Sequence, residues 1–300
     1  MRSLTTVLLL ALLAGCLGAA QSPAPTFDGA RAYEHLRQVV AIGPRPAGSP
    51  GAEKTRTYIR QQFAAMGLTP REQSFVARTP LGPVSMTNLR VTIPGAKSNR
   101  LVIGGHYDTK IFREFPFLGA NDGGSSTAFL IELGRLLQRR ANRATIELLF
   151  LDGEESTANW EGTDHTYGSR HYVDAARKDG SLKDIGAFIL VDMIGDYDLR
   201  IQREARSTPW LADAIWGAAK RIGRHEFGAG TVAVEDDHLN FLAAGVPAID
   251  IIDFEYYTRS GAQAWHTRHD TLENVSARSL EIVGEVLLAA LPAVEKRLAR

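Results

Sequence analysis

The chain contains, near its middle, the stretch Leu148-Leu149-Phe150-Leu151-Asp152-Gly153-Glu154-Glu155. A continuous aliphatic run of this length is typical of a strand buried on both faces of a parallel sheet. Two adjacent acids, Glu154 and Glu155, follow the run where the strand should end. Ligands of open α/β sheets bind beyond the carboxyl ends of the strands. The stretch therefore predicts an α/β fold with a carboxylate pair at the rim of an active site.

The rest of the chain repeats this pattern of buried strands and helices. Further aliphatic runs predict buried strands at 101–103, 188–191 and 248–252, and the alternation in 86–93 predicts an edge strand. Helical spacing is found at 28–42, 49–66, 126–140, 169–178, 209–222 and 279–300. We therefore expect a single α/β domain with a mostly parallel central sheet flanked by helices on both faces.

Length and composition agree with one well-packed domain. The chain has 300 residues, of which 44% are hydrophobic and 23% charged, so a large core is expected and disorder is not. Basic and acidic residues both number 34, which gives a formal net charge of zero. This balance argues against nucleic acid as a partner.

The N-terminus has the pattern of an export signal. Arg2 precedes an apolar run at 7–13, and small residues continue to Ala20. The run is too short to span a bilayer as a mature helix, so residues 1–20 are interpreted as a signal peptide and the mature chain is expected to have no transmembrane span. Residues 21–27 are interpreted as a linker, and residues 28–300 as the folded domain.

The signal contains the only cysteine of the chain. Leu13-Ala14-Gly15-Cys16 resembles the lipobox of bacterial lipoproteins, in which the cysteine becomes the lipidated first residue. Cleavage before Gln21 is the alternative. The protein is thus expected in the periplasm or cell envelope, with a lipid anchor at Cys16, or else secreted. In either case the mature domain must fold without a disulfide.

Polar side chains follow three predicted strands in succession. His106 and Asp108 follow the first, the acid pair follows the second, and Asp192 follows the third. A single acid in such a place is most often a helix cap or a solvated loop residue. Because the strands of a parallel sheet end at one edge, the whole set should converge on one site.

The converging groups are suited to zinc. A catalytic zinc takes three protein ligands, imidazole nitrogens or carboxylate oxygens, and keeps a fourth position open. Asp122, Glu155 and His266 can supply these three ligands. Neighbouring side chains point in different directions, so Glu154 remains available to carry protons.

At these residues the chain resembles the co-catalytic zinc aminopeptidase superfamily and, within it, the animal-type glutaminyl-peptide cyclotransferases, or glutaminyl cyclases. The resemblance extends from about Tyr33 to the C-terminal helix. The superfamily pattern implies a general base at Glu154. It implies metal-binding groups at His106, Asp122, Glu155, Asp192 and His266.

Four local features are similar to the cyclases more than to the aminopeptidases. They are His106-Tyr107-Asp108-Thr109-Lys110, Trp160, Asp236-Asp237-His238, and Trp265 directly before His266. Partial burial for packing alone is the alternative role for the two tryptophans. Helix capping is the alternative for Asp236, with Asp237 as a second candidate for that cap. The chain departs from the animal enzymes in lacking their cysteine pair and in a longer loop at 253–264.

The resemblance implies an acyltransferase that converts the N-terminal glutamine of a peptide or protein to pyroglutamate and releases ammonia. One zinc would polarise the γ-carbonyl. Glu154 would carry a proton from the α-amine to the leaving ammonia. Asp192 and Asp236, joined by a hydrogen bond, would orient the amide, and Trp160 and Trp265 would line the substrate pocket.

Two alternatives remain. In a zinc aminopeptidase, His106 and Asp192 would bind a second zinc, and a metal-bridged hydroxide would cleave the first peptide bond. A non-catalytic binding module on the same fold would be expected to have lost ligands or the base, whereas this chain retains all of them.

Overall fold

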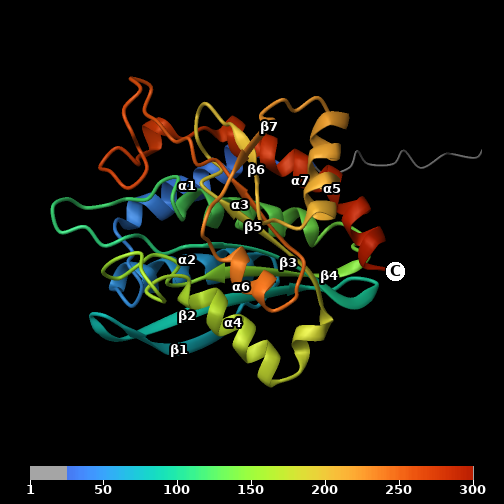
Figure 1. Cartoon of the computed structure of the whole chain (residues 1–300), viewed down its shortest axis with the longest axis horizontal. Coiled ribbons are helices and arrows are strands. Elements are labelled where there is room, and N and C mark those ends of the chain that lie inside the picture. The colour runs from blue at the N-terminus through green and yellow to red at the C-terminus, as the bar shows by residue number, and fades with distance from the viewer. Residues whose placement is uncertain (1–25, 300) are drawn as a thin grey trace, which may run out of the picture.

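The computed structural model describes residues 26–299 (Figure 1). The helices are α1 (Gly29–Ile42), α2 (Pro50–Ala65), α3 (Gly124–Leu137), α4 (Tyr167–Lys178), α5 (Pro209–Arg221), α6 (His238–Ala243) and α7 (Ala277–Leu298). The strands are β1 (Arg71–Thr79), β2 (Gly82–Ile93), β3 (Lys97–His106), β4 (Ala144–Leu151), β5 (Ile185–Asp192), β6 (Ile201–Glu204), β7 (Phe227–Val232) and β8 (Ala248–Ile252).

Six strands form the central sheet in the order β1-β2-β4-β3-β5-β8. The pairs β4·β3, β3·β5 and β5·β8 are parallel, whereas β1·β2 and β2·β4 are antiparallel. β6 and β7 form a separate two-stranded parallel sheet. The expected single α/β domain with a mostly parallel sheet is confirmed.

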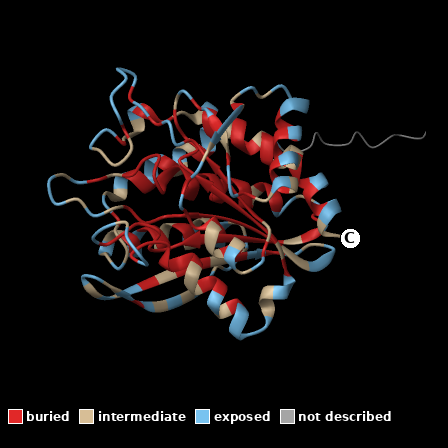
Figure 2. Cartoon of the chain, in the orientation of Figure 1, coloured by how far each residue is buried: buried red, intermediate tan, exposed pale blue. Residues whose placement is uncertain are grey.

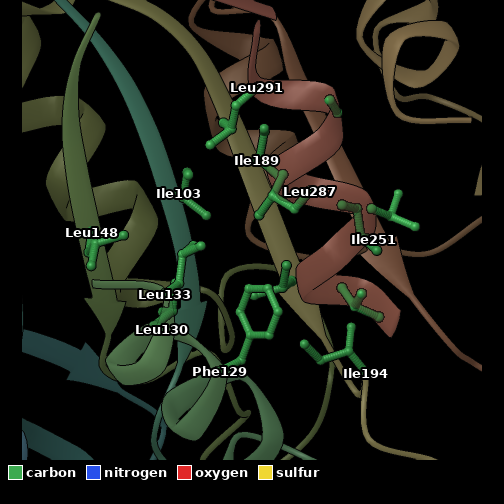
Figure 3. Close-up of a cluster of buried hydrophobic side chains, with 14 of the residues drawn as sticks. Ile103, Phe129, Leu130, Leu133, Leu148, Ile189, Ile194, Ile251, Leu287 and Leu291 are labelled. Carbon is green, nitrogen blue, oxygen red and sulfur yellow. The ribbon is translucent and has the colours of Figure 1, made fainter. Parts of the chain in front are cut away.

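Helices cover both faces of this sheet. One face packs in a single hydrophobic cluster against side chains of α2, α3, α5 and α7, and the other packs against α4 and α6. Figure 3 shows α3 and α7 side chains meeting strand residues Ile103, Leu148, Ile189 and Ile251. Burial of each such side chain contributes about 1.5–3 kcal/mol. In Figure 2 the central strands are buried along most of their length, and the exposed residues lie in the loops, on the outer helix faces and on the edge strand β1.

The predicted helices agree with the observed ones to within a few residues. The side chain of Asp28 accepts a hydrogen bond from Arg31 N at 2.9 Å and caps α1. Ser49 caps α2 in the same way, with Pro50 in its first turn. These local signals define the helix ends because each cap satisfies an amide that the helix leaves without a partner.

The assignment of 86–93 as an edge strand was wrong. β2 lies between β1 and β4, and β1 is the edge. β1 escaped prediction because most of its side chains are exposed or half-buried, as expected for an edge strand, so its hydrophobic pattern is weak. β6 and β7 were missed because both are short, and because β7 contains two glycines, which have low strand propensity.

The linker predicted at 21–27 extends one residue too far, because Phe27 belongs to the folded domain. Phe27 is 2% exposed and stacks on Phe129 of α3 at a ring-centroid distance of 4.9 Å, so it belongs to the core. The signal peptide, Cys16 and Gln21 lie outside the described residues. Among residues 26–299, no helix is long and apolar enough to cross a membrane.

Candidate active site

The sheet brings the predicted site residues to one edge. His106 is the last residue of β3, Asp192 is the last of β5, and the acid pair follows β4 after Asp152 and Gly153. Except for His106, these residues border a pocket of about 180 Å³. Eight of the nine predicted site residues line it: Asp122, Glu154, Glu155, Trp160, Asp192, Asp236, Trp265 and His266. The ninth, His106, does not line this pocket, but it contacts Asp122 and Asp192.

Asp122, Glu155 and His266 form a compact donor set. His266 Nε2 lies 3.2 Å from Asp122 Oδ2 and 3.1 Å from Glu155 Oε1. One ligand atom from each residue lies within 4.8 Å of the others. Asp122 Oδ2 is buried without a hydrogen-bond partner among the described residues. One nitrogen and two carboxylate oxygens of this kind fit a catalytic zinc, and an unsatisfied buried carboxylate oxygen is what a cation would neutralise.

A second donor set shares Asp122 with the first. His106 Nε2 lies 3.1 Å from Asp122 Oδ1 and 3.2 Å from Asp192 Oδ1. These three residues also meet the distance condition for one metal ion. The protein geometry therefore accommodates either one ion or a pair of ions bridged by Asp122.

Buried carboxylates outside the pocket hold the ligand loops in place. Asp108 accepts hydrogen bonds from Glu154 N at 3.1 Å and from Glu155 N at 3.3 Å. Asp270 accepts a bond from Asp122 N at 3.1 Å. Both are almost inaccessible to solvent. The main-chain segments that carry Glu155 and Asp122 are thus each held by a buried carboxyl group.

Two glycines with positive φ permit the turns that carry the acids. Gly153, at φ 70°, precedes Glu154, and a Cβ there would lie 2.4 Å from Met86 Sδ. Gly123, at φ 73°, follows Asp122, and a Cβ there would lie 2.5 Å from Asp108 O. At both positions a side chain is disfavoured for two reasons: the backbone is left-handed, and a Cβ would clash with neighbouring atoms.

The acids inside the pocket shift one another's pKa values. Burial raises the pKa of Glu154 well above its usual value, and the charges of Asp236 and Glu155 add to this, although His106 opposes it. Burial and the neighbouring Asp192 likewise raise the pKa of Asp236. A carboxyl group with a raised pKa can take up and return a proton near neutral pH.

The predicted bond between Asp192 and Asp236 stays a prediction. Asp192 Oδ1 accepts from Met193 N at 2.8 Å and lies 3.2 Å from His106 Nε2. The side chain of Asp236 accepts from Asp237 N. A hydrogen bond between the two acids requires that one of them carry a proton, which the raised pKa of Asp236 favours.

Aromatic rings form the walls of the pocket. Trp265 stacks on His266 at 4.1 Å and contacts the ring of Phe254 at 4.8 Å. Trp160 stacks on His165 at 4.3 Å, and its Nε1 donates a hydrogen bond to Glu235 Oε2 at 3.1 Å. Both tryptophans line the pocket as expected, and their stacking also fixes their orientation.

Some site residues were not found from the sequence. Phe254 and Glu235 line the pocket, and Lys110 Nζ lies 3.4 Å from Glu155 Oε2. Asp250, on β8, is fully buried and neither of its carboxyl oxygens has a hydrogen-bond partner among the described residues. An acid inside the aliphatic run 248–252 was the available signal for it.

The alternative assignment of Asp237 as a helix cap was wrong. It stands at the N-cap position of α6, but its side chain makes no capping hydrogen bond. It accepts a hydrogen bond from Ser169 Oγ of α4 instead. Its own backbone φ of −51° is helical, which differs from the extended conformation that a side-chain cap requires.

This is an α/β domain with a mixed sheet, and carboxylate and imidazole side chains gather where the parallel strands end. Such an arrangement is typical of a zinc-exopeptidase type of domain. Residues 88–291 match peptidase family M28, and the chain belongs to that family. A zinc-dependent exopeptidase from Parabacteroides distasonis, 23% identical, has the same fold with a TM-score of 0.77.

Within this family the glutaminyl cyclases stand out among the similar proteins. The crystal structure of an Acidobacteriales bacterium glutaminyl cyclase is 42% identical, with a TM-score of 0.87, and the match covers 94% of this chain and all of that one. The glutaminyl-peptide cyclotransferase-like protein of Bos taurus is 28% identical over 286 residues, which cover 85% of this chain and 73% of that protein. The Porphyromonas gingivalis glutaminyl cyclase is 26% identical with a TM-score of 0.80. The resemblance expected from the sequence is confirmed.

Proposed function

We propose that this chain is a zinc-dependent glutaminyl-peptide cyclotransferase that converts N-terminal glutamine to pyroglutamate. The observation that carries the proposal is a single pocket holding three zinc-type ligands, the neighbouring acid Glu154 and two tryptophans. The names of the relatives with 42% and 28% identity agree with it. Peptides or proteins with N-terminal glutamine are the proposed substrates.

The reaction forms one carbon–nitrogen bond and breaks another. The substrate α-amine attacks the carbon of its own side-chain amide, and ammonia leaves. A zinc held by Asp122, Glu155 and His266 would supply the positive charge that stabilises the oxyanion. Glu154 accepts the proton lost by the amine and returns it to the departing nitrogen, as its raised pKa allows.

The remaining pocket residues position the substrate. The carboxyl groups of Asp192 and Asp236 can accept hydrogen bonds from the amide nitrogen, which lies on the side opposite the carbonyl oxygen. Trp160 and Trp265 confine the glutamine side chain between apolar walls. This confinement holds the amine close to the amide carbon and keeps water from competing as the nucleophile.

We propose one zinc per chain. In the aminopeptidase alternative, His106 and Asp192 would bind a second ion, for which the geometry also has room. Metal analysis of the purified, active protein separates the two. About one zinc per chain supports the cyclase, and two zinc ions together with cleavage of leucine or alanine substrates support the peptidase.

A glutamine dipeptide with a fluorogenic amide leaving group tests the reaction directly. Loss of ammonia with the dye still attached is the expected result, whereas release of the dye without cyclisation would refute the proposal. We expect Glu154→Gln to lower the rate by about 10²–10⁴ while zinc content and folding are retained. Glu161→Gln, an exposed acid beside the pocket loop, is the matched control.

Export is also proposed, from the signal sequence alone. The intact mass of the mature protein distinguishes lipidated Cys16 from a chain that begins at Gln21. In the second case the protein's own N-terminus is glutamine, so the mass of pyroglutamate at that end would be a further sign of the activity.

A further inference from the structure

We propose that Glu235 selects the second residue of the substrate, favouring lysine or arginine over aspartate or glutamate. The inference rests on the proposed function and concerns the same pocket. Glu235 immediately precedes Asp236 in the chain, yet its side chain is 54% exposed, whereas Asp236 is buried. The two neighbours therefore occupy opposite ends of the pocket: Asp236 lies at its buried end, beside the reacting groups, and Glu235 lies at its mouth.

The orientation of the substrate places its second residue near this mouth. The side-chain amide of the N-terminal glutamine must reach the buried donor set of Asp122, Glu155 and His266. The α-carbonyl and the next residue then point back towards solvent. The exposed or half-exposed residues that line the pocket at that end include Trp160, Glu235 and Phe254.

Glu235 is held in a fixed position at the mouth. Its Oε2 accepts the hydrogen bond from Trp160 Nε1 at 3.1 Å, and its Oε1 lies 3.9 Å from His165 Nε2. Burial lowers the pKa of His165, so this imidazole is neutral near pH 7 and leaves the carboxylate charge uncompensated. A carboxylate anchored through one oxygen presents the other to a ligand with little loss of side-chain entropy.

The surroundings do not cancel the charge of Glu235. No lysine or arginine lines the pocket, although five further acids do. These acids add little to the negative charge at the mouth, because burial raises the pKa of Glu154 and Asp236 towards their neutral forms and a zinc would offset two of the other charges. Among nearby cations, Lys110 pairs with Glu155. Arg206 donates to Val234 O and also pairs with Glu204. A cationic second residue therefore gains an attraction, and an anionic one meets repulsion.

The test compares dipeptide amides that differ only at the second residue. We expect the ratio of kcat/KM for Gln-Lys over Gln-Glu to be about three- to tenfold, because exposed charge pairs contribute up to about fivefold each and here attraction and repulsion act together. The ratio should fall as salt is raised, since the pairs are solvent-exposed. Gln-Ala serves as the uncharged reference.

Glu235→Gln removes the charge but keeps an oxygen that can accept the Trp160 hydrogen bond. The ratio should fall to near one in this variant and should invert in Glu235→Lys. Glu161→Gln removes an equal charge from an exposed residue that does not line the pocket, and the wild-type ratio should persist there.

The outcomes separate this inference from the proposed function. Equal cyclisation of Gln-Lys and Gln-Glu by the wild type, or an unchanged ratio in Glu235→Gln, would overturn the role of Glu235 and leave the cyclase assignment in place. Failure of the wild-type, zinc-loaded protein to cyclise any of the three substrates would overturn both.

Discussion

Asp108 does not line the pocket, yet it fixes both members of the acid pair. Its two carboxyl oxygens accept from Glu154 N and Glu155 N, and His106 Nδ1 lies 3.5 Å from one of them. One buried carboxylate thus positions the proton carrier and a metal ligand together. The chemistry proposed for Glu154 and Glu155 therefore depends on Asp108, a residue that does not line the pocket.

We expect Asp108→Asn to lower kcat by about 10–100-fold, the range seen when supporting partners of metal ligands are removed. An asparagine offers one acceptor and turns a donor towards the second amide, so the loop must shift. The value of kcat and the zinc content of the variant should be measured together. A variant with normal kcat would show that the loop holds its position without this carboxylate.

At the scale of helices and strands, buried polar contacts hold neighbouring elements together in addition to hydrophobic packing. Glu147 of β4 is 1% exposed at its side chain and bonds Arg90 of β2, Arg100 of β3 and Tyr172 of α4. Burial works against its ionisation, but the bonds and charges of Arg90, Tyr172 and Arg100 outweigh it and lower its pKa below 4.5. Three strands and a helix therefore depend on one ionised side chain.

Replacement of Glu147 by Gln is expected to cost about 2–4 kcal/mol at neutral pH, because two arginines lose their partner. A lowered pKa in the folded state gives stability above the unfolded value of about 4.5, and this stability is lost as the pH falls through the folded pKa. The difference in the free energy of unfolding between wild type and variant should thus be largest at neutral pH and should shrink in acid. Urea unfolding between about pH 7 and about pH 3 measures it. A gap that grows in acid would contradict the assignment, and Glu161→Gln should show little change.

Two helical glycines are expected to respond oppositely to the same substitution. A Cβ on Gly284 of α7 would lie 2.1 Å from the ring of Phe27, so Gly284→Ala should destabilise the fold by about 1–3 kcal/mol. Gly217 of α5 faces open space, and Gly217→Ala should stabilise it by about 0.5–1 kcal/mol. Thermal unfolding of the metal-free variants compares the two. An unchanged or raised Tm in Gly284→Ala would mean that Phe27 does not pack on α7 in this way.

For the molecule as a whole, the clustered acids of the pocket should make stability depend on a bound metal. Several carboxyl groups with raised pKa values lie together at the end of the sheet, among them Glu154, Asp236 and Asp250. A divalent cation would offset part of this repulsion and would bind only the folded chain. Binding should therefore be visible as stability.

Zinc at about 100 times its dissociation constant should add about 2.7 kcal/mol, or about 5–10 °C in Tm. Scanning calorimetry with and without chelator measures the shift. Glu154→Gln, which keeps all three proposed ligands, should retain it, and Asp122→Asn should lose most of it. An equal shift in Asp122→Asn would place the ion elsewhere.

The buried strands, the main helices and the order of acids along the chain could all be predicted from the sequence. Those features depend on local periodicity and caps, as in the run 146–151 and at Asp28 and Ser49, which are physical properties of neighbouring residues. Eight of the residues that line the pocket were named from the sequence, because they follow predicted strands or stand in segments that resemble the superfamily or its cyclases.

Which side chains lie next to one another depends on the folded arrangement of the layers. His266 meets Glu155 across 111 residues of sequence, and Asp108 reaches the acid pair across 46. The central position of β2, the burial of Phe27 and the outward turn of Glu235 beside the buried Asp236 were likewise settled by packing. Burial and contact between distant residues depend on how the layers assemble, and local sequence does not encode that geometry.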